Sequence, residues 1–379
     1  MSTLNVETLE GAAQNERSST ADDHDQRQRP MPSEQRKRLN WGLLLMCVAC
    51  MAIGAIGGPL LQRLYYLHGG NRKWLVSCLQ TIGFPLILIP LPFLFFRTRG
   101  LAKPESFFIK PRLFFAGAFL GILLGLQNYM YSAGLAYIPV STSSLLFSTQ
   151  LAFTAISAFL IVKQKFTFYS INSVILMTLG AIVLALHTSS DRPPGVSNGQ
   201  YLTGFFFTLG GAALLGITLP CIELSYRKAG QAVTYMVVLQ FQLVFTISAT
   251  IFCVIGMAIN NDFKVIPREA REYGLGKAKY YVVLVGNAVV YQCLFIGTLG
   301  VVYCSSSLFT GIMSAVLLPF TPIAAVIAFK EKFTGEKGMS LALCLWGFSS
   351  YFIGEFKKSK KMTPLPETEA EPDANDAGV

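Results

Sequence analysis

Long apolar runs alternate with short polar segments along most of this chain. A helix needs about 20 residues to cross the hydrocarbon core of a bilayer, and ten of the apolar runs approach or exceed that length. The runs cover residues 41–62, 74–96, 113–137, 141–162, 168–187, 201–222, 233–259, 279–299, 301–328 and 338–355. The pattern predicts an all-α polytopic membrane protein with about ten transmembrane helices.

Polar segments flank and divide these runs. Residues 1–40 and 357–379 contain too few apolar side chains to form a core, so we expect disordered cytoplasmic tails at both ends. Residues 189–200 form a polar connector with Pro and Gly near the middle of the chain. These boundaries leave two membrane-embedded units, residues 41–188 and residues 201–356.

The two units carry matching residues in the same order. Three sets recur at spacings of 161, 163 and 167 residues. They are Ile56, Pro59, Tyr65 and Gly69 with Ile217, Pro220, Tyr226 and Gly230; Ser143, Ser144 and Leu145 with Ser306, Ser307 and Leu308; and Lys163, Lys165, Phe166 and Thr167 with Lys330, Lys332, Phe333 and Thr334. Because each unit holds five spans, an odd number, the second copy must lie upside down relative to the first. Two inverted five-helix repeats are typical of secondary transporters.

Composition narrows the possible classes of function. Of the 379 residues, 52% are hydrophobic and 14% are charged, against about 25% charged in a soluble domain. The net charge of +10 comes from Lys and Arg between the apolar runs, which is a pattern of membrane topology rather than of nucleic-acid binding. The eight cysteines lie in apolar stretches and are interpreted as small buried hydrophobes. We therefore expect neither a disulfide framework nor a metal site.

The loops predict how the chain is oriented. Lys and Arg are more frequent in the loops on the N-terminal side of the predicted bilayer than in the opposite loops, which favours both termini in the cytoplasm. The longest loop, residues 260–276, carries acidic and basic side chains and predicts a short surface helix.

Amide side chains within the apolar runs are the strongest functional signal. Such groups cost free energy in lipid unless they face a cavity or a partner, so they often mark a substrate pathway. The amides deep in the spans are Gln80, Gln127, Asn128, Gln150, Gln240, Gln242, Asn287 and Gln292.

Two of these amides share a helix face with a tyrosine. Tyr131 follows Asn128 by three residues, and Tyr291 follows Asn287 by four. An aromatic ring beside an amide suits a flat, nitrogen-rich heterocycle, because the ring stacks while the amide bonds its edge. The predicted substrate site consists of Gln80, Gln127, Asn128, Tyr131, Gln150, Gln240, Asn287 and Tyr291. The alternative is that the amides are hydrogen-bonding links between helices.

Glycine and proline predict hinges at matching places in the two units. Gly57, Gly58 and Pro59 lie in the first run, and Pro220 lies at the matching position of the second unit. Proline breaks or bends helices, and broken helices offer bare backbone groups to a substrate. The alternative is close packing of helices against glycine.

One acidic residue is a candidate for proton coupling. No acid lies in the middle of a predicted span, and Glu223 lies at the edge of one. Burial would favour its protonated form, as proton exchange requires. The alternative is an ion pair with Arg227 or Lys228.

Two long motifs carry a family resemblance. They are GGPLLQRLYYLHGGNRKWLVSCLQTIGFPLILIPLPF at residues 57–93 and AYIPVSTSSLLFSTQLAFTAISAFLIVKQKFT at residues 136–167. Both resemble the signatures of the plant purine permeases, a branch of the drug/metabolite transporter superfamily, and the resemblance extends over residues 41–356. It implies a proton symporter for adenine, cytokinins or related alkaloids, in the plasma membrane, without a cofactor. The PxxEL pattern that contains Glu223 resembles the same family.

Other functions make demands that the sequence does not meet. A nucleotide-sugar or phosphate-metabolite exchanger carries anions and would need Lys or Arg inside the spans. A multi-pass membrane enzyme would need acids, histidines or cysteines converging on one face. Lys, Arg, acids and histidines are absent from the middle of the runs, and two inverted halves disfavour a receptor. The sequence therefore predicts a transporter and not an enzyme.

Overall fold

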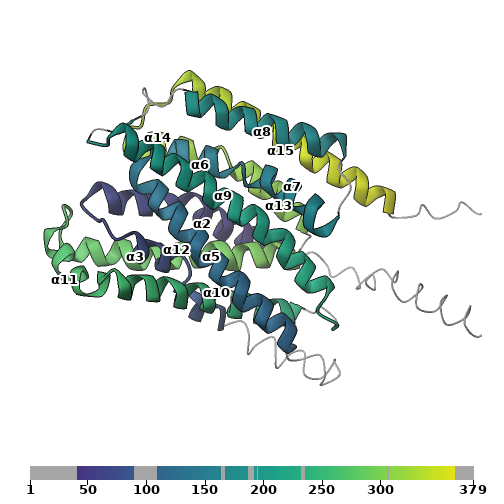
Figure 1. The fold of residues 1–379 in the computed structure, drawn as a ribbon, viewed down its shortest axis with the longest axis horizontal. Helices are drawn as coiled ribbons and strands as arrows, with labels where there is room; N and C mark the ends of the chain where they lie inside the picture. The colour runs from purple at the N-terminus through teal and green to yellow at the C-terminus, as the bar shows by residue number, and fades with distance from the viewer. Residues whose placement is uncertain are drawn as a thin grey trace, which may run out of the picture.

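Every element described in the computed structural model of this protein is a helix. The structure describes residues 41–88, 109–163, 167–186, 192–193, 195–231, 235–304 and 307–362. The helices are α2 (Trp41–Leu67), α3 (Lys73–Leu79), the 3₁₀ helix η1 (Phe84–Leu88), α5 (Pro111–Tyr137), α6 (Val140–Phe147), α7 (Gln150–Val162), α8 (Phe168–Leu186), α9 (Asn198–Arg227), α10 (Tyr235–Ile259), α11 (Asp262–Glu272), α12 (Lys277–Cys304), α13 (Ser307–Leu317), α14 (Phe320–Phe329) and α15 (Gly335–Met362). They form an elongated bundle, with α11 at one end (Figure 1).

Seven segments of the described chain are long and apolar enough to cross a membrane. They are Trp41–Leu67, Pro111–Tyr137, Val140–Ile161, Phe168–Leu186, Asn198–Arg227, Val237–Ile259 and Lys277–Val301. The predicted all-α membrane fold is therefore confirmed, whereas the predicted ten spanning helices are not reached within the described ranges. α15 covers the predicted tenth span and is long enough, but it is less apolar than the seven.

The predicted second span is interrupted soon after it begins. α3 ends at Leu79, and η1 begins at Phe84 after a turn. Pro85 has no backbone N–H and disfavours helical geometry at the preceding residue, which explains the break. Residues 89–96 of this predicted span lie outside the described residues.

Two other predicted spans consist of shorter helices. α6 and α7 are separated by Ser148 and Thr149, whose hydroxyls each donate to the carbonyl three residues earlier, at 2.6 Å. Side-chain bonds of this kind compete with helical backbone bonds. α13 and α14 meet at Leu318 and Pro319, where the missing proline N–H has the same effect.

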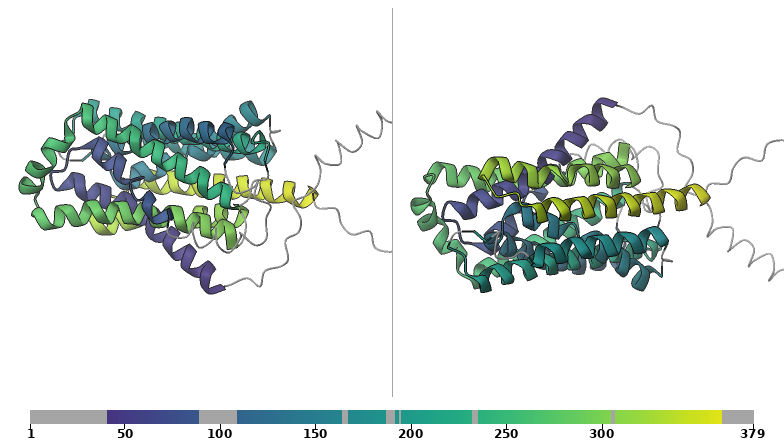
Figure 2. Two further views of the ribbon diagram at one scale, coloured as in Figure 1. Left: turned by 90° about the horizontal axis from the view of Figure 1, so that it is seen from below. Right: turned by 90° about the horizontal axis from the view of Figure 1, so that it is seen from above.

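The long helices pack in pairs that join the two units. α2 lies along α12, α5 lies along α9 and α10, and α8 lies beside α15 in an outer layer (Figure 1). α2 begins on the side of the bundle away from α11, and α15 ends on that same side (Figure 2).

Matched positions of the two units share an unusual backbone conformation. Gly69 and Gly230, just beyond α2 and α9, have φ values of +99° and +59°. Lys163 and Lys330, just beyond α7 and α14, have φ values of +55° and +53°. This left-handed conformation is uncommon for non-glycine residues and ends a helix. The aligned sequence positions therefore end corresponding helices in the same way.

Some predicted boundaries change in the structure. α9 begins at Asn198 because Ser197 and Gln200 form a reciprocal capping box, so the connector is shorter than residues 189–200. α15 continues to Met362, so residues 357–362 of the predicted C-terminal tail are helical. The predicted surface helix is confirmed as α11. Residues 1–40 and 363–379 lie outside the described residues.

Candidate functional site

Buried amides with unpartnered atoms lie on α5, on α12 and on α2, which packs against both of them. Gln62, Asn128, Asn287 and Gln292 are each at most 4% exposed. Both polar atoms of Gln62, Asn287 and Gln292, and Nδ2 of Asn128, have no hydrogen-bond partner. Burying a polar group without a partner costs free energy. These amides are therefore poised to bind a ligand or water.

The packing of α2 against α12 brings two of these amides to one level. A Cβ at Gly58 would lie 2.8 Å from the Tyr291 ring, and one at Gly286 would lie 3.7 Å from Leu61. The two helices therefore run antiparallel. Gln62, one turn beyond Gly58, lies at about the level of Asn287, one turn before Tyr291.

The turn after α3 links α5 to α12. Gln80 Nε2 donates to Ser132 Oγ at 3.0 Å and to the Asn128 carbonyl at 3.5 Å. A Cβ at Gly83 would lie 3.2 Å from Gln292 Oε1. Because only glycine leaves room here, the interrupted second span fits between the amide of α5 and the amide of α12.

Three tyrosines complete the site. Tyr66 of α2 packs against the apolar cluster that contains Tyr131 of α5, and the Tyr66 hydroxyl has no hydrogen-bond partner. Tyr291 of α12 lies within electrostatic range of both. We call these residues the amide–tyrosine cluster: Gln62, Tyr66, Asn128, Tyr131, Asn287, Tyr291 and Gln292. The cluster combines neutral donors and acceptors with aromatic rings and contains no charged side chain.

Four of the eight predicted substrate residues belong to this cluster: Asn128, Tyr131, Asn287 and Tyr291. Gln80 adjoins it through the bond to the Asn128 carbonyl. The cluster also contains residues outside the predicted set. Gln292 had a sequence signal, since it is an amide inside an apolar span, whereas Gln62 lay at the edge of its predicted span and Tyr66 lay beyond it. α2 extends five residues past that edge, to Leu67.

The remaining predicted substrate residues lie elsewhere. The backbone carbonyls of Gln127 and Gln150 face glycines of α9, so these residues line the contact of α9 with α5 and α7. Gln150 Oε1 is buried there without a partner. Gln240 accepts a hydrogen bond from the Ile109 backbone N–H at 2.9 Å, and therefore helps to hold the start of α5.

Glu223 does not have the burial that its candidate role in proton coupling requires. Its side chain is 49% exposed and pairs with Arg227, one turn later on α9, at 2.6 Å. The residue lies in the last two turns of the helix, where spacing of i and i+4 puts the two side chains on one surface. This is the ion pair considered as the alternative.

The predicted hinges do not interrupt their helices. α2 is continuous through Pro59, and α9 is continuous through Pro220. A Cβ at Gly57 would lie 3.2 Å from Val290, so Gly57 and Gly58 allow close contact with α12. The helix breaks occur instead in the α3–η1, α6–α7 and α13–α14 segments.

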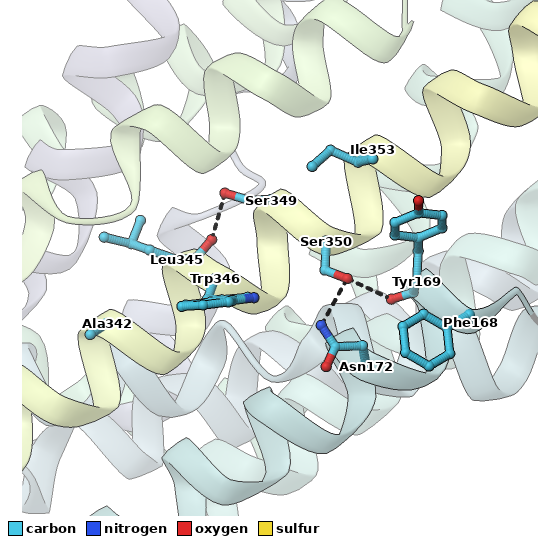
Figure 3. Close-up of a pocket in the computed structure, with 9 residues that line it drawn as sticks. All are labelled: Phe168, Tyr169, Asn172, Ala342, Leu345, Trp346, Ser349, Ser350 and Ile353. Carbon is cyan, nitrogen blue, oxygen red and sulfur yellow. Dashed lines mark hydrogen bonds between the residues drawn. The ribbon is translucent and has the colours of Figure 1, made fainter.

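A groove of about 640 Å³ lies apart from the cluster, between α8 and α15 (Figure 3). Asn172 Nδ2 donates to Ser350 Oγ at 3.0 Å, and this hydroxyl donates to the Tyr169 carbonyl at 3.0 Å. Phe168 and Trp346 at its rim are 80% and 69% exposed. Large exposed apolar side chains are what a lipid-facing surface carries, so this groove is not a candidate for a site inside the bundle.

Known proteins resemble this chain over most of its length. A family model described as purine nucleobase transmembrane transport matches residues 42–361. Purine permease 3 of Arabidopsis thaliana is 47% identical over 333 residues, which cover 87% of this chain and 95% of that protein. Purine permease 2 of the same plant is 48% identical over 335 residues, 84% of this chain and 94% of that protein. Probable purine permease 11 is 35% identical over 85% of each chain.

Proposed function

The chain belongs to the purine permease family of purine nucleobase transporters, and we propose that it carries neutral purine-type heterocycles across a membrane together with protons. Adenine, cytokinins and related alkaloids are the proposed substrates. Family membership itself establishes an integral membrane transporter rather than an enzyme. The proposed location is the plasma membrane, with both termini in the cytoplasm. The start of α2 and the end of α15 lie on the same side of the bundle (Figure 2), which supports placing both termini on one side of the membrane.

The amide–tyrosine cluster is the observation that carries the proposed substrate class. A purine offers both hydrogen-bond donors and acceptors on its edge, and Gln62, Asn287 and Gln292 each have both kinds of atom unpartnered. Tyrosine rings offer stacking surfaces to the flat face of such a molecule. We therefore place the substrate between α2, α5 and α12.

The same cluster disfavours an anionic substrate such as a nucleotide sugar. Anionic groups are bound in proteins by Arg and Lys through charge-assisted hydrogen bonds. Arg63 is the nearest cation on α2, and its Nη1 already donates to the Leu135 carbonyl at 3.0 Å. A neutral heterocycle therefore fits the cluster better than a phosphate ester.

We propose transport by alternating access between two helix bundles. α2, α12 and α14 pack together, as do α5, α7, α9 and α10, and each group contains helices of both sequence units. The matched left-handed helix ends and the reciprocal pairing of α2 with α12 and of α9 with α5 support two inverted repeats, residues 41–188 and 201–356. Movement between these bundles would expose the cluster to each side in turn.

The two bundles are joined at the α11 end by a corner clamp. Arg63 donates to the last carbonyls of α5. Glu331 accepts from the backbone N–H groups of Val140 and Ser141, at 2.9 and 3.0 Å, and from the Ser141 hydroxyl at 2.6 Å. Cations suit the C-terminal end of a helix and anions its N-terminal end. The clamp therefore holds the α5–α6 corner from both sides.

Uptake of labelled adenine tests the substrate site. Asn287→Leu keeps a similar volume but removes both amide atoms, so the apparent KM should rise roughly tenfold or more, because a lost buried hydrogen bond costs about 1–3 kcal/mol. Glu223→Gln, which changes only an exposed ion pair, is the matched control and should transport normally.

Two results would count against the proposal. Adenine uptake that is unaffected by Asn287→Leu would remove the cluster from the substrate site. Absence of adenine uptake by the intact protein, with no competition by cytokinins or alkaloids, would overturn the proposed substrate class. Uptake that ignores an imposed pH gradient and a protonophore would overturn proton coupling alone.

A further inference from the structure

Two carboxylates lie buried on one face of α11. The side chains of Asp262 and Glu269 are 0% and 7% exposed, and their spacing of seven residues puts them on the same side of the helix. Arg72, in the connection between α2 and α3, lies between them. Its Nη1 is 3.4 Å from Asp262 Oδ1, and its Nε is 3.5 Å from Glu269 Oε2.

Glu269 is fully engaged as a carboxylate. Its Oε1 accepts from the hydroxyls of Tyr65, at 2.5 Å, and Tyr280, at 3.1 Å. Its Oε2 accepts from the Asn71 backbone N–H at 3.3 Å and faces Arg72. Three hydrogen-bond donors from α2, α12 and the α2–α3 connection, together with the Arg72 ion pair, therefore surround this carboxylate.

Asp262 has a different environment. Its Oδ1 accepts from Asn260 Nδ2 at 2.8 Å and from Arg72 at 3.4 Å, while its buried Oδ2 has no hydrogen-bond partner. Burial raises the pKa of Asp262 above its ordinary value, and the neighbouring Glu269 charge adds to this, whereas Asn260 and Arg72 act against it. Asp262 Oδ2, which is buried and accepts no hydrogen bond, is therefore the atom best placed to bind a proton.

The net charge of Arg72, Asp262 and Glu269 also favours a proton on Asp262. One guanidinium faces two carboxylates, so the group carries one excess negative charge when both acids are ionised. The other titratable side chains around Glu269 are the phenols Tyr65, Tyr66, Tyr273 and Tyr280, which are neutral at physiological pH. His68 packs on Tyr273 at 6.0 Å, and its Nδ1 lies 2.9 Å from the Leu64 carbonyl. A single proton on Asp262 neutralises the group.

This buried group adjoins the amide–tyrosine cluster. Tyr65 follows Gln62 by three residues, a rise of about 4.5 Å along α2. Tyr280 precedes Asn287 by seven residues on α12, which puts both on one face. Tyr66 of the cluster lies within electrostatic range of Glu269. A change of charge at the acids therefore acts on the same helices that hold the substrate amides.

We infer that Asp262, together with Glu269 and Arg72, is the proton-binding site that couples substrate movement to the proton gradient. The inference rests on the proposed proton symport. A hydronium ion gives its proton to Asp262 Oδ2 and leaves as water, and the reverse step returns the proton to water on the opposite side after the carrier reorients. Asp262 binds the proton, while Glu269, held by its three hydrogen-bond donors, positions Arg72.

Purified protein in proteoliposomes separates coupling from transport itself. Labelled adenine uptake driven by an imposed pH gradient is compared with adenine exchange at equal pH on both sides. Asp262→Asn should lose most gradient-driven accumulation, roughly tenfold, while exchange persists, because a permanently neutral side chain mimics the protonated form. Glu223→Gln should show both activities at the level of the intact protein.

The outcomes distinguish this inference from the proposed function. Intact protein that exchanges adenine but never responds to the gradient would overturn proton symport and this site with it. Asp262→Asn that accumulates adenine normally, or that loses exchange and accumulation in equal measure, would overturn the site alone.

A second variant covers the case in which Asp262→Asn does not fold. Tyr280→Phe keeps the ring and removes one donor to Glu269. It should shift the pH of half-maximal gradient-driven uptake while exchange persists. An unchanged pH profile in this variant would contradict the site.

Discussion

At the scale of single residues, the polar side chains of this protein form two chemically different groups. Neutral amides and phenols lie in the centre, and many of their atoms have no partner. Charged side chains such as Arg63, Glu269 and Glu331 lie towards the α11 end and have defined partners. A neutral substrate site beside a charged network suits a carrier whose substrate is uncharged and whose coupling ion is a proton.

The raised pKa of Asp262 predicts a pH effect on stability. The folded protein keeps this proton to a higher pH than the unfolded chain, in which the pKa is near 3.8. The stabilising effect is therefore complete below about pH 3.8, and it is lost as the pH rises through the folded pKa. Asp262→Asn has no such dependence.

Melting temperatures in detergent measure this effect. The difference between Asp262→Asn and the intact protein should change in favour of the variant as the pH rises across that window. Taking the difference cancels the other titrating groups. A difference that stays constant from about pH 4 to about pH 8 would contradict the raised pKa.

At the scale of helices, function depends on where helices end. α5 ends and α6 begins at one corner, and the terminal backbone groups of both helices lack helical hydrogen-bond partners. Arg63 and Glu331, from the bundle that contains α2 and α14, bind these groups instead. Lys337, which is 1% exposed, adds a bond from its Nζ to Ser141 Oγ at 2.8 Å. Unbroken helices through this region would offer no such groups to bind. The corner is therefore a natural gate.

Glu331→Gln should loosen this gate. The amide keeps the size of the side chain but replaces one acceptor with a donor that faces backbone N–H groups. A hydrogen bond to a charged group contributes about 1.5–3 kcal/mol, so the equilibrium should shift roughly tenfold towards opening at the α11 end.

Thiol labelling reports the opening. Leu135 is 0% exposed beside the clamp, so Leu135→Cys should react with a membrane-impermeant reagent faster when combined with Glu331→Gln. The same chain without Leu135→Cys measures the reaction of the native cysteines. Equal labelling rates for Leu135→Cys alone and for Leu135→Cys combined with Glu331→Gln would argue against a gate at this corner.

At the scale of the whole molecule, contacts between the two sequence units hold the bundle together. α2 and α12 come from different units, and their glycines allow a close approach, with Gln62 at about the level of Asn287. A Cβ at Gly54 would lie 2.6 Å from the Leu294 backbone, whereas one at Gly286 would meet only Leu61, at 3.7 Å.

This difference predicts opposite effects of one methyl group. Gly54→Ala should cost about 1–3 kcal/mol, because overpacking forces the helices apart. Gly286→Ala should be neutral or stabilising by up to about 1 kcal/mol, because alanine favours helix and the site is open. Melting temperatures of the two variants give the comparison. Similar melting temperatures would mean that the two helices pack differently.

The sequence by itself determined the family, the all-helical membrane fold and four of the seven residues of the amide–tyrosine cluster. Amides such as Asn128 and Asn287 stand out because polarity inside an apolar span is a local property of the chain. The left-handed residues that end matched helices were also visible, as repeated Gly and Lys positions in the two units.

Only the tertiary structure decided which polar groups share a site. Gln127 and Asn128 are neighbours in sequence, yet the backbone of Gln127 contacts α9 while the Asn128 carbonyl accepts from Gln80, in the turn after α3. Glu223 had the acidic chemistry for proton binding but lies exposed near a helix end, and Asp262 became a candidate because α11 folds back onto Arg72. Burial and partnership depend on contacts between distant segments, so no local pattern could specify them.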